Sequence, residues 1–238
     1  MWNGNVAKAA ALLLLAASIT SITACDSRAP ASQAAQGATA PTQAIQLRHR
    51  VDPARNRVWS LTPQGLFLHE TAAGAKVAVN LPAWQWAGEP YGCVPDLALG
   101  PKGEAVVTSD VMPTLWRIDP ESLAISVHSP QLDADVDQDV GFSAIAYSSA
   151  QSAWFAVSSQ GSLWRIDPLF RRAEKLALRD PLPKACGLAG SSRSASLGRS
   201  RVTGLCLRTT EGTWVIDVFP DQRSAYARAA PCIAHGSL

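Results

Sequence analysis

From residue 47 onward, the chain is a series of short runs rich in apolar and β-branched residues, separated by turn residues. Four such runs lie at residues 57–62, 105–109, 153–158 and 202–207. Runs of this length and composition are typical of β-strands. No stretch after residue 46 has a helical period, so the pattern predicts an all-β domain.

The strand pattern repeats along the chain. The six residues Leu115–Pro120, with the sequence LWRIDP, return unchanged at Leu163–Pro168, 48 positions later. An identity of this length at a long fixed spacing indicates tandem structural repeats. One aromatic residue recurs at the corresponding place of four units, as Phe67, Trp116, Trp164 and Trp214.

Each unit is predicted to contain four short strands. In the second unit we expect them at Leu97–Leu99, Glu104–Ser109, Thr114–Asp119 and Leu123–Ser129. Four strands in about 48 residues, with an aromatic residue on the third, are typical of a β-propeller blade. The recurrent aromatic residue is then expected to pack between blades.

The predicted β-propeller is small. Four units of 48 residues account for residues 47–238, and four blades are the small extreme of this class. The alternatives are an open array that is completed by dimerisation and a different division into strands. An Asp follows the aromatic residue in three units, as Asp119, Asp167 and Asp217, and is expected to cap the next turn.

The first 24 residues have a different pattern, typical of an export signal. Lys8 is followed by an apolar run, residues 9–17, that is too short to span a bilayer as a helix. Residues 22–25, Ile-Thr-Ala-Cys, resemble the lipobox of bacterial lipoproteins. The resemblance implies cleavage before Cys25 and attachment of a diacylglyceryl group and further acyl chains, such as palmitate, at that residue. The alternative is an ordinary signal peptide with a chance cysteine at its border.

Residues 25–46 are predicted to be a flexible tether. Residues 27–46 are rich in Ala, Gln, Ser, Thr and Pro and cannot build a core. The predicted organisation is a signal peptide at 1–24, the lipid-attachment cysteine and tether at 25–46, and a propeller-like domain at 47–238. An Asp after the lipidated cysteine resembles an inner-membrane retention signal, so Asp26 slightly favours that membrane. The expected location is the periplasmic side of the bacterial cell envelope.

The overall charge of the chain argues against nucleic acid as a partner. Without Lys8, the chain carries 20 basic and 19 acidic residues. A net charge so close to zero argues against electrostatic binding of nucleic acid. The expected partners are the membrane, through the lipid anchor, and an envelope protein or small ligand.

Four cysteines besides Cys25 are candidates for disulfide bonds. An even number of cysteines in an exported domain predicts two bonds. Three pairings are open, and the places of the cysteines in the predicted blades favour Cys186–Cys206 and Cys93–Cys232.

A connector rich in Pro and Gly is a candidate binding loop, because the connectors between blades emerge on one face of a propeller. It carries Trp84, Trp86 and Tyr91. Aromatic residues in such loops often anchor a partner. The alternative is that Trp84 or Trp86 caps the core between two blades.

A second connector carries four alternating carboxylates, Asp133, Asp135, Asp137 and Asp139. Oxygen ligands in this pattern suit Ca²⁺. However, Gln138 and Ala144 stand where an EF-hand loop has its Gly and its bidentate Glu. The differences favour a solvated acidic loop.

Residues 95–103 and the LWRIDP segment after them resemble a blade of the SMP-30/gluconolactonase-like and NHL-like propellers. The resemblance implies that Asp96 corresponds to a ligand of the central divalent metal in the lactonases. Leu97 replaces the Gly of that motif, and the family's Glu and Asn ligands are replaced by Phe142–Ala144 and Cys186–Leu188. Those enzymes also have six blades, so the resemblance supports the fold more than the activity.

Two functions are compatible with these features. The first is a non-catalytic, membrane-anchored scaffold that binds a protein or small ligand in the envelope. The alternative is a divalent-metal-dependent, lactonase-type hydrolase centred on Asp96. A scaffold and anchor without a complete catalytic set favour the first. No cofactor is firmly implied, although Asp96 or the acidic connector would suit Ca²⁺ or another divalent metal.

Overall fold

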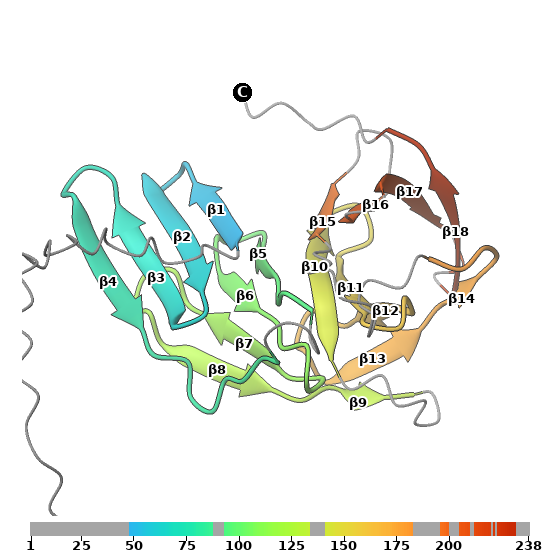
Figure 1. The fold of residues 1–238 in the computed structure, drawn as a ribbon, viewed down its shortest axis with the longest axis horizontal. Helices are drawn as coiled ribbons and strands as arrows, with labels where there is room; N and C mark the ends of the chain where they lie inside the picture. The colour runs from blue at the N-terminus through green and yellow to red at the C-terminus, as the bar shows by residue number, and fades with distance from the viewer. Residues whose placement is uncertain are drawn as a thin grey trace, which may run out of the picture. The chain divides into compact units, whose positions relative to one another are not determined.

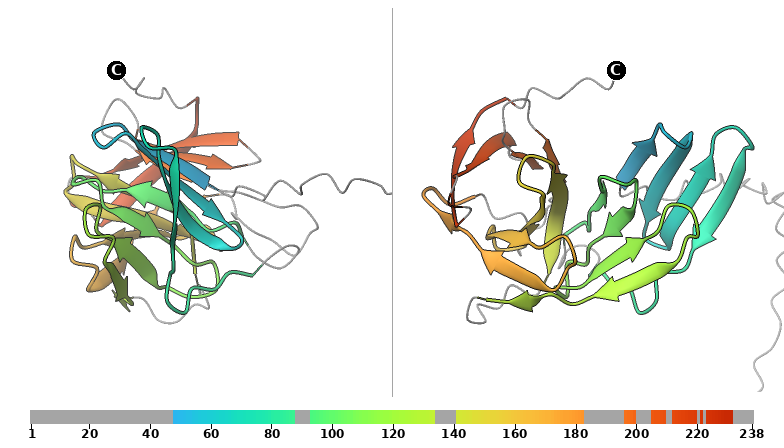
Figure 2. Two further views of the ribbon diagram at one scale, coloured as in Figure 1. Left: turned by 90° about the vertical axis from the view of Figure 1, so that its left-hand side faces the viewer. Right: turned by 180° about the vertical axis from the view of Figure 1, so that it is seen from behind.

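The computed structural model describes residues 48–87, 93–133, 141–182, 196–199, 205–209, 212–219, 221 and 223–231. They belong to one compact unit. Every regular element in these ranges is a β-strand, which confirms the predicted all-β class. Nothing in the described ranges forms a helix that could cross a membrane. Figures 1 and 2 show the strands grouped in small twisted sheets, and there are four of these.

The first two sheets, blades 1 and 2, each contain four antiparallel strands in chain order. Blade 1 consists of β1 (Arg48–Asp52), β2 (Arg57–Thr62), β3 (Gly65–Glu70) and β4 (Ala75–Val79). Blade 2 consists of β5 (Leu97–Leu99), β6 (Ala105–Val107), β7 (Leu115–Ile118) and β8 (Ile125–His128). All four strands of blade 2 lie within the ranges that the sequence predicts.

Blades 3 and 4 have a fifth strand each. The strands of blade 3 are β10 (Phe142–Ser148), β11 (Ala153–Ser158), β12 (Leu163–Ile166), β13 (Arg172–Lys175) and β9 (Gln131–Leu132). Those of blade 4 are β15 (Ser196–Arg199), β16 (Leu205–Thr209), β17 (Gly212–Val218), β18 (Ser224–Ala229) and β14 (Ala177–Leu178). The extra strands β9 and β14 pair in parallel with β13 and β18. Each belongs to the connector that leaves the preceding blade, so it ties one blade to the outer edge of the next.

Both faces of the middle blades are buried, as expected for stacked blades. One apolar cluster joins blades 1 and 2 around Trp59, and a second joins blades 2 and 3 around Trp154. A third joins blades 3 and 4 around Phe155. Trp154 and Phe155 are neighbours on β11 and point to opposite clusters, because successive strand residues alternate between faces. Burial of each large side chain contributes roughly 1.5–3 kcal/mol.

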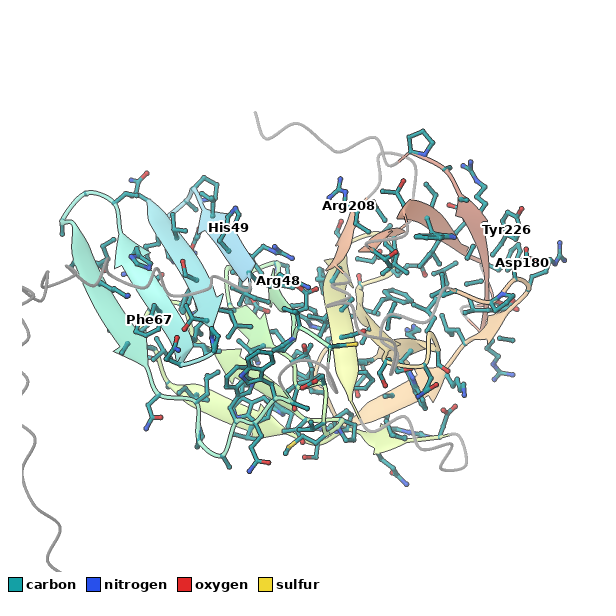
Figure 3. All side chains as sticks on the ribbon, in the orientation of Figure 1. Arg48, His49, Phe67, Asp180, Arg208 and Tyr226 are labelled. Carbon is teal, nitrogen blue, oxygen red and sulfur yellow. The ribbon has the colours of Figure 1, made fainter. Side chains whose placement is uncertain are left out.

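The recurrent aromatic residue packs between blades, as predicted. Trp116 belongs to the cluster between blades 1 and 2, and Trp164 to that between blades 2 and 3. Trp214 packs against the cluster between blades 3 and 4. Phe67, labelled in Figure 3, is half-buried and has Lys76 Nζ 4.1 Å from its ring centroid. Each aromatic residue thus faces the blade before its own, and in the described part no blade precedes that of Phe67.

The first strands of the blades lie against one another in series: β1 packs on β5, β5 on β10, and β10 on β15. Figure 1 shows the blades following one another in this order, from blue through green and yellow to red. The described residues therefore form an incomplete propeller of four blades.

Two of the three predicted turn caps are confirmed. Asp119 accepts hydrogen bonds from backbone N–H groups of its turn, chiefly Ser122, and these hold its pKa below the ordinary value. Asp167 accepts equivalent bonds. The prediction is wrong for Asp217, which pairs with Tyr226 inside the sheet. Because β17 is three residues longer than β7, the turn comes later and Asp221 caps it.

Candidate functional site

Asp96 precedes β5, and its side chain is fully buried where three blades meet. Its Oδ1 accepts hydrogen bonds from Arg48 Nε at 3.2 Å, Arg50 Nη2 at 3.1 Å and the backbone N–H of Leu97 at 2.9 Å. Its Oδ2 accepts a bond from the backbone N–H of Ile145 at 3.0 Å. Figure 3 labels Arg48, which lies on the β5 side of β1. The carboxylate therefore joins the first strands of blades 1, 2 and 3.

These contacts bear on the metal-ligand role expected for Asp96. Four N–H groups donate to this carboxylate, three to Oδ1 and one to Oδ2, and two of the four belong to cations. Ser143, at a place where the lactonases have a further ligand, donates its hydroxyl to Val157 O at 3.1 Å. Within the described ranges, no cluster of three or more His, Cys, Asp or Glu suits a metal ion. A metal at Asp96 would have to bind beside two guanidinium groups, and this role stays a prediction.

The connector from β4 to β5 carries Trp84 and Trp86 and is described up to residue 87. Trp84 Nε1 donates to Thr108 O at 2.9 Å, and the ring packs against the cluster between blades 1 and 2. The next residue, Gln85, accepts a bond at its carbonyl oxygen from Ser109 Oγ at 2.6 Å. Trp84 thus has the packing role that was the alternative, while Trp86 is half-buried.

A cleft of about 480 Å³ lies beside this loop, and we call it the blade 1 cleft. Its walls are the turn between β2 and β3 (residues 63–65), the end of β4 with the residues after it (79–81), and residues 84–86. Gln64, Asn80 and Gln85 are exposed at the cleft, next to Trp86. The residues described as its lining include no ionisable side chain. The cleft therefore offers an aromatic ring and neutral hydrogen-bonding groups.

Asp110 holds the far end of the same loop. Its Oδ1 accepts a hydrogen bond from Ala87 N at 3.0 Å, whereas its buried Oδ2 has no partner in the part of the chain that is described. Burial raises the pKa of Asp110 from 3.8 to about 6, and the backbone N–H groups of Ala87, Asp110 and Cys93 oppose only part of this effect. Gly141 fits closely against it, because an added Cβ would lie 2.2 Å from the Asp110 carbonyl carbon. The loop is therefore fixed at several points on blade 2.

A related cleft of about 560 Å³ lies on blade 3. It is formed by the corresponding elements, namely the turn between the second and third strands, the end of the fourth strand, and the connector that follows. Its lining includes Lys175, Leu176, Leu178 and Leu182 but no aromatic residue. The repeat thus produces two similar clefts with different chemistry, and the tryptophan loop belongs to the blade 1 cleft.

Of the acidic connector, the structure describes Asp133. Its Oδ1 accepts a hydrogen bond from Lys175 N at 2.8 Å, and its backbone N–H donates to Ala173 O at 3.1 Å. Asp133 therefore ties the connector to β13. Asp135, Asp137 and Asp139 lie outside the described residues, so calcium binding there stays a prediction.

The structure describes two of the four cysteines that are predicted to form disulfide bonds. Cys93 and Cys206 are each 1% exposed, and neither is a free thiol. Cys186, Cys232, Cys25 and Tyr91 lie outside the described residues. The proposed pairings and the lipidation therefore stay predictions, and Tyr91 is not part of the cleft as described.

The sequence analysis missed the arginine pair and the amide-lined cleft. Arg48 lies one repeat before Asp96, which places the two residues at equivalent positions of neighbouring blades. That spacing was a usable signal for their contact. Gln64 and Asn80 carry no such signal, because only the packing of two turns brings them to one cleft.

No protein-family model and no curated protein matches this sequence. The similarity is to solved structures. A catalytically inactive virginiamycin B lyase from Staphylococcus aureus, solved with quinupristin, is 15% identical over 77% of this chain and 54% of its own, with a TM-score of 0.52. A streptogramin B lyase structure is 14% identical over 78% of this chain and 54% of its own, with a TM-score of 0.51.

A third similar structure is an auxiliary nutrient binding protein from Bacteroides thetaiotaomicron. It is 10% identical over 80% of this chain and 43% of its own, with a TM-score of 0.53. The chain thus spans about half, or less, of the length of these three proteins. At such low identity the similarity establishes a propeller-like fold, and the chemistry has to be argued from the residues of this chain.

Proposed function

We propose that this protein is a lipid-anchored component of the bacterial cell envelope whose propeller domain binds a ligand in the blade 1 cleft. The observation that carries the proposal is a tryptophan loop held in place beside a cleft of small-molecule size. A loop that is already ordered loses less conformational entropy when a ligand binds, which favours affinity.

The anchor is supported by the sequence. The lipobox-like segment ends at Cys25, and several acyl chains suffice for stable membrane attachment. The tether of residues 25–46 would give the domain a reach of roughly 25 Å if it behaves as a flexible chain. Disulfide pairing of Cys186 with Cys206 and of Cys93 with Cys232 is part of the proposal, because the periplasm allows such bonds.

The binding function can be tested with the full chain in detergent micelles. Ligand-observed NMR with a panel of neutral sugars, amino acids, nucleosides and small carboxylates should detect binding of at least one class. Trp86→Ala should abolish this binding. Leu169→Ala is a suitable control, because Leu169 is exposed on a turn of blade 3. Equal binding by the Trp86 variant would refute the proposed site.

The competing proposal is a metal-dependent hydrolase centred on Asp96. It rests on the resemblance to the lactonases, and the two arginines bound to Asp96 oppose it. Metal analysis of the purified protein and a lactone-hydrolysis assay, each repeated with Asp96→Asn, would decide between the two. Stoichiometric metal together with hydrolysis, both lost in the variant, would favour the enzyme.

A further inference from the structure

We infer that the blade 1 cleft accepts a neutral saccharide, with one sugar ring resting on the indole of Trp86. This inference depends on the proposed binding function, and it specifies the chemical class of the ligand. Three features of the cleft carry it: the absence of charge in the described lining, the three amide side chains, and the state of the two tryptophans.

The first feature favours an uncharged ligand over a charged one. The described residues that line the cleft are neutral. A charged group that enters a cleft loses part of its hydration, and this loss needs a compensating charge or several hydrogen bonds. The carboxylate of nearby Asp110 is buried and accepts a bond from Ala87. A ligand without charge therefore suits this cleft better than an anion or a cation.

The second feature selects hydroxyl-rich ligands. The amide side chains of Gln64, Asn80 and Gln85 are exposed at three places around the cleft and make no hydrogen bond with the described residues. An amide both donates and accepts hydrogen bonds. A sugar hydroxyl does the same, so several neighbouring hydroxyls can be bound by these three groups.

The third feature distinguishes Trp86 from Trp84. The indole N–H of Trp84 is bonded to Thr108 O, and its ring packs against the core. Trp86 is half-buried, and its indole N–H makes no hydrogen bond within the part of the chain that the structure describes. An aromatic ring that is partly exposed to solvent suits a ligand that has an apolar face and a polar rim. A pyranose ring has both, since its C–H groups form one face and its hydroxyls surround it.

The related cleft on blade 3 provides an internal comparison. It has the same backbone elements, but leucines and Lys175 replace the tryptophans and most of the amides. That cleft offers a saccharide neither an aromatic ring on which to stack nor enough hydrogen-bonding groups. Gln160, on the corresponding turn of blade 3, is therefore a matched control for Gln64.

The test uses the full chain in detergent micelles and neutral oligosaccharides, namely glucans and N-acetylglucosamine oligomers. Uronic acid oligomers serve as charged counterparts. We expect tryptophan fluorescence to change on titration with a neutral glycan and not with the charged one. Trp86→Ala should abolish binding, Asn80→Leu and Gln64→Leu should each weaken it roughly fivefold to tenfold, and Gln160→Leu should leave it unchanged.

The outcomes separate this inference from the function on which it rests. If amino acids, nucleosides or carboxylates bind with the same dependence on Trp86 while neutral glycans do not, the saccharide inference fails and the binding cleft stands. If no ligand of any class depends on Trp86, both fail. If a neutral glycan binds equally well to the Trp86 and Asn80 variants, it binds elsewhere, and the inference is overturned.

Discussion

Asp110→Asn is expected to remove a destabilisation of the domain that grows as the pH rises toward neutral. Asp110 is 6% exposed, and one of its carboxylate oxygens has no hydrogen-bond partner among the described residues. Above its pKa, the folded protein therefore holds a buried negative charge that the backbone N–H groups of Ala87, Asp110 and Cys93 compensate only in part. Asparagine keeps an oxygen that can accept the bond from Ala87 N and removes the charge.

The magnitude follows from the pKa of Asp110, which burial raises from 3.8 to about 6. Between these values the folded protein holds a proton that the unfolded chain has released, so a rise in pH favours unfolding. The difference corresponds to about 3 kcal/mol, at about 1.4 kcal/mol per pKa unit. Because the covering loop lies near solvent, we expect about 1–3 kcal/mol in practice. This destabilisation is absent below about pH 4 and complete above about pH 6.

Urea unfolding, followed by tryptophan fluorescence between about pH 4 and pH 8, measures this effect. The free energy of unfolding of the variant minus that of the wild type should increase from pH 4 to pH 6 and then stay constant. The amide nitrogen introduced at a buried position can add a destabilising offset of about 1–3 kcal/mol. That offset is independent of pH, so the pH dependence of the difference is the test.

Asp119→Asn is a control for which we expect the opposite pH dependence of stability. Hydrogen bonds from its turn lower the pKa of Asp119, so this carboxylate stabilises the fold at neutral pH and loses that effect as the pH falls through its folded-state pKa. The Asp119 variant should therefore be less stable than the wild type at pH 7 and more similar to it in acid. A difference for Asp110→Asn that does not vary between pH 4 and pH 7 would refute the argument.

Four further predictions follow from the structure and the sequence. Asp96→Ala should destabilise the domain by about 2–4 kcal/mol in urea unfolding, because two arginines would lose a buried carboxylate; a change below about 1 kcal/mol would contradict its joining role. Gly141→Ala should lower stability by about 1–3 kcal/mol in the same assay, since the new methyl group meets the backbone of Asp110, and an unchanged midpoint would argue against that close fit. Cys25→Ser should move the protein from the membrane to the soluble fraction, and retention in the membrane would argue against lipidation. Mass mapping under non-reducing conditions should find no free thiol among the four cysteines of the domain, whereas free thiols at all four would remove the disulfide proposal.

The strands of blade 2 could be predicted well because their signals are local. Leu97–Leu99 is bounded by turn residues on both sides, and the structure places β5 at the same residues. The role of Trp116 followed from its recurrence, since a large apolar side chain at the same place of every blade has to meet the neighbouring blade. Local pattern and repeat spacing together were enough for the architecture.

The remaining features depend on packing that no local pattern records. The strands β9 and β14 have two residues each, too few for a period-two pattern, so the fifth strand of blades 3 and 4 was not predicted. The sequence predicts a turn at Asp217 because its neighbours match those of Asp119 and Asp167. The sequence does not reveal that β17 continues further before it turns.

The spacing of the repeat also bears on the metal-ligand role that the family resemblance implies for Asp96. Residues one repeat apart lie side by side: Arg48 and Asp96 are 48 positions apart, Asp96 and Ile145 are 49 apart, and hydrogen bonds join both pairs. The charged partners of Asp96 therefore come from the first strand of the preceding blade. Two arginines there give the site a net positive charge, which repels a divalent cation. The described residues that line the blade 1 cleft carry no charge, and for this reason we place ligand binding there and not at the centre.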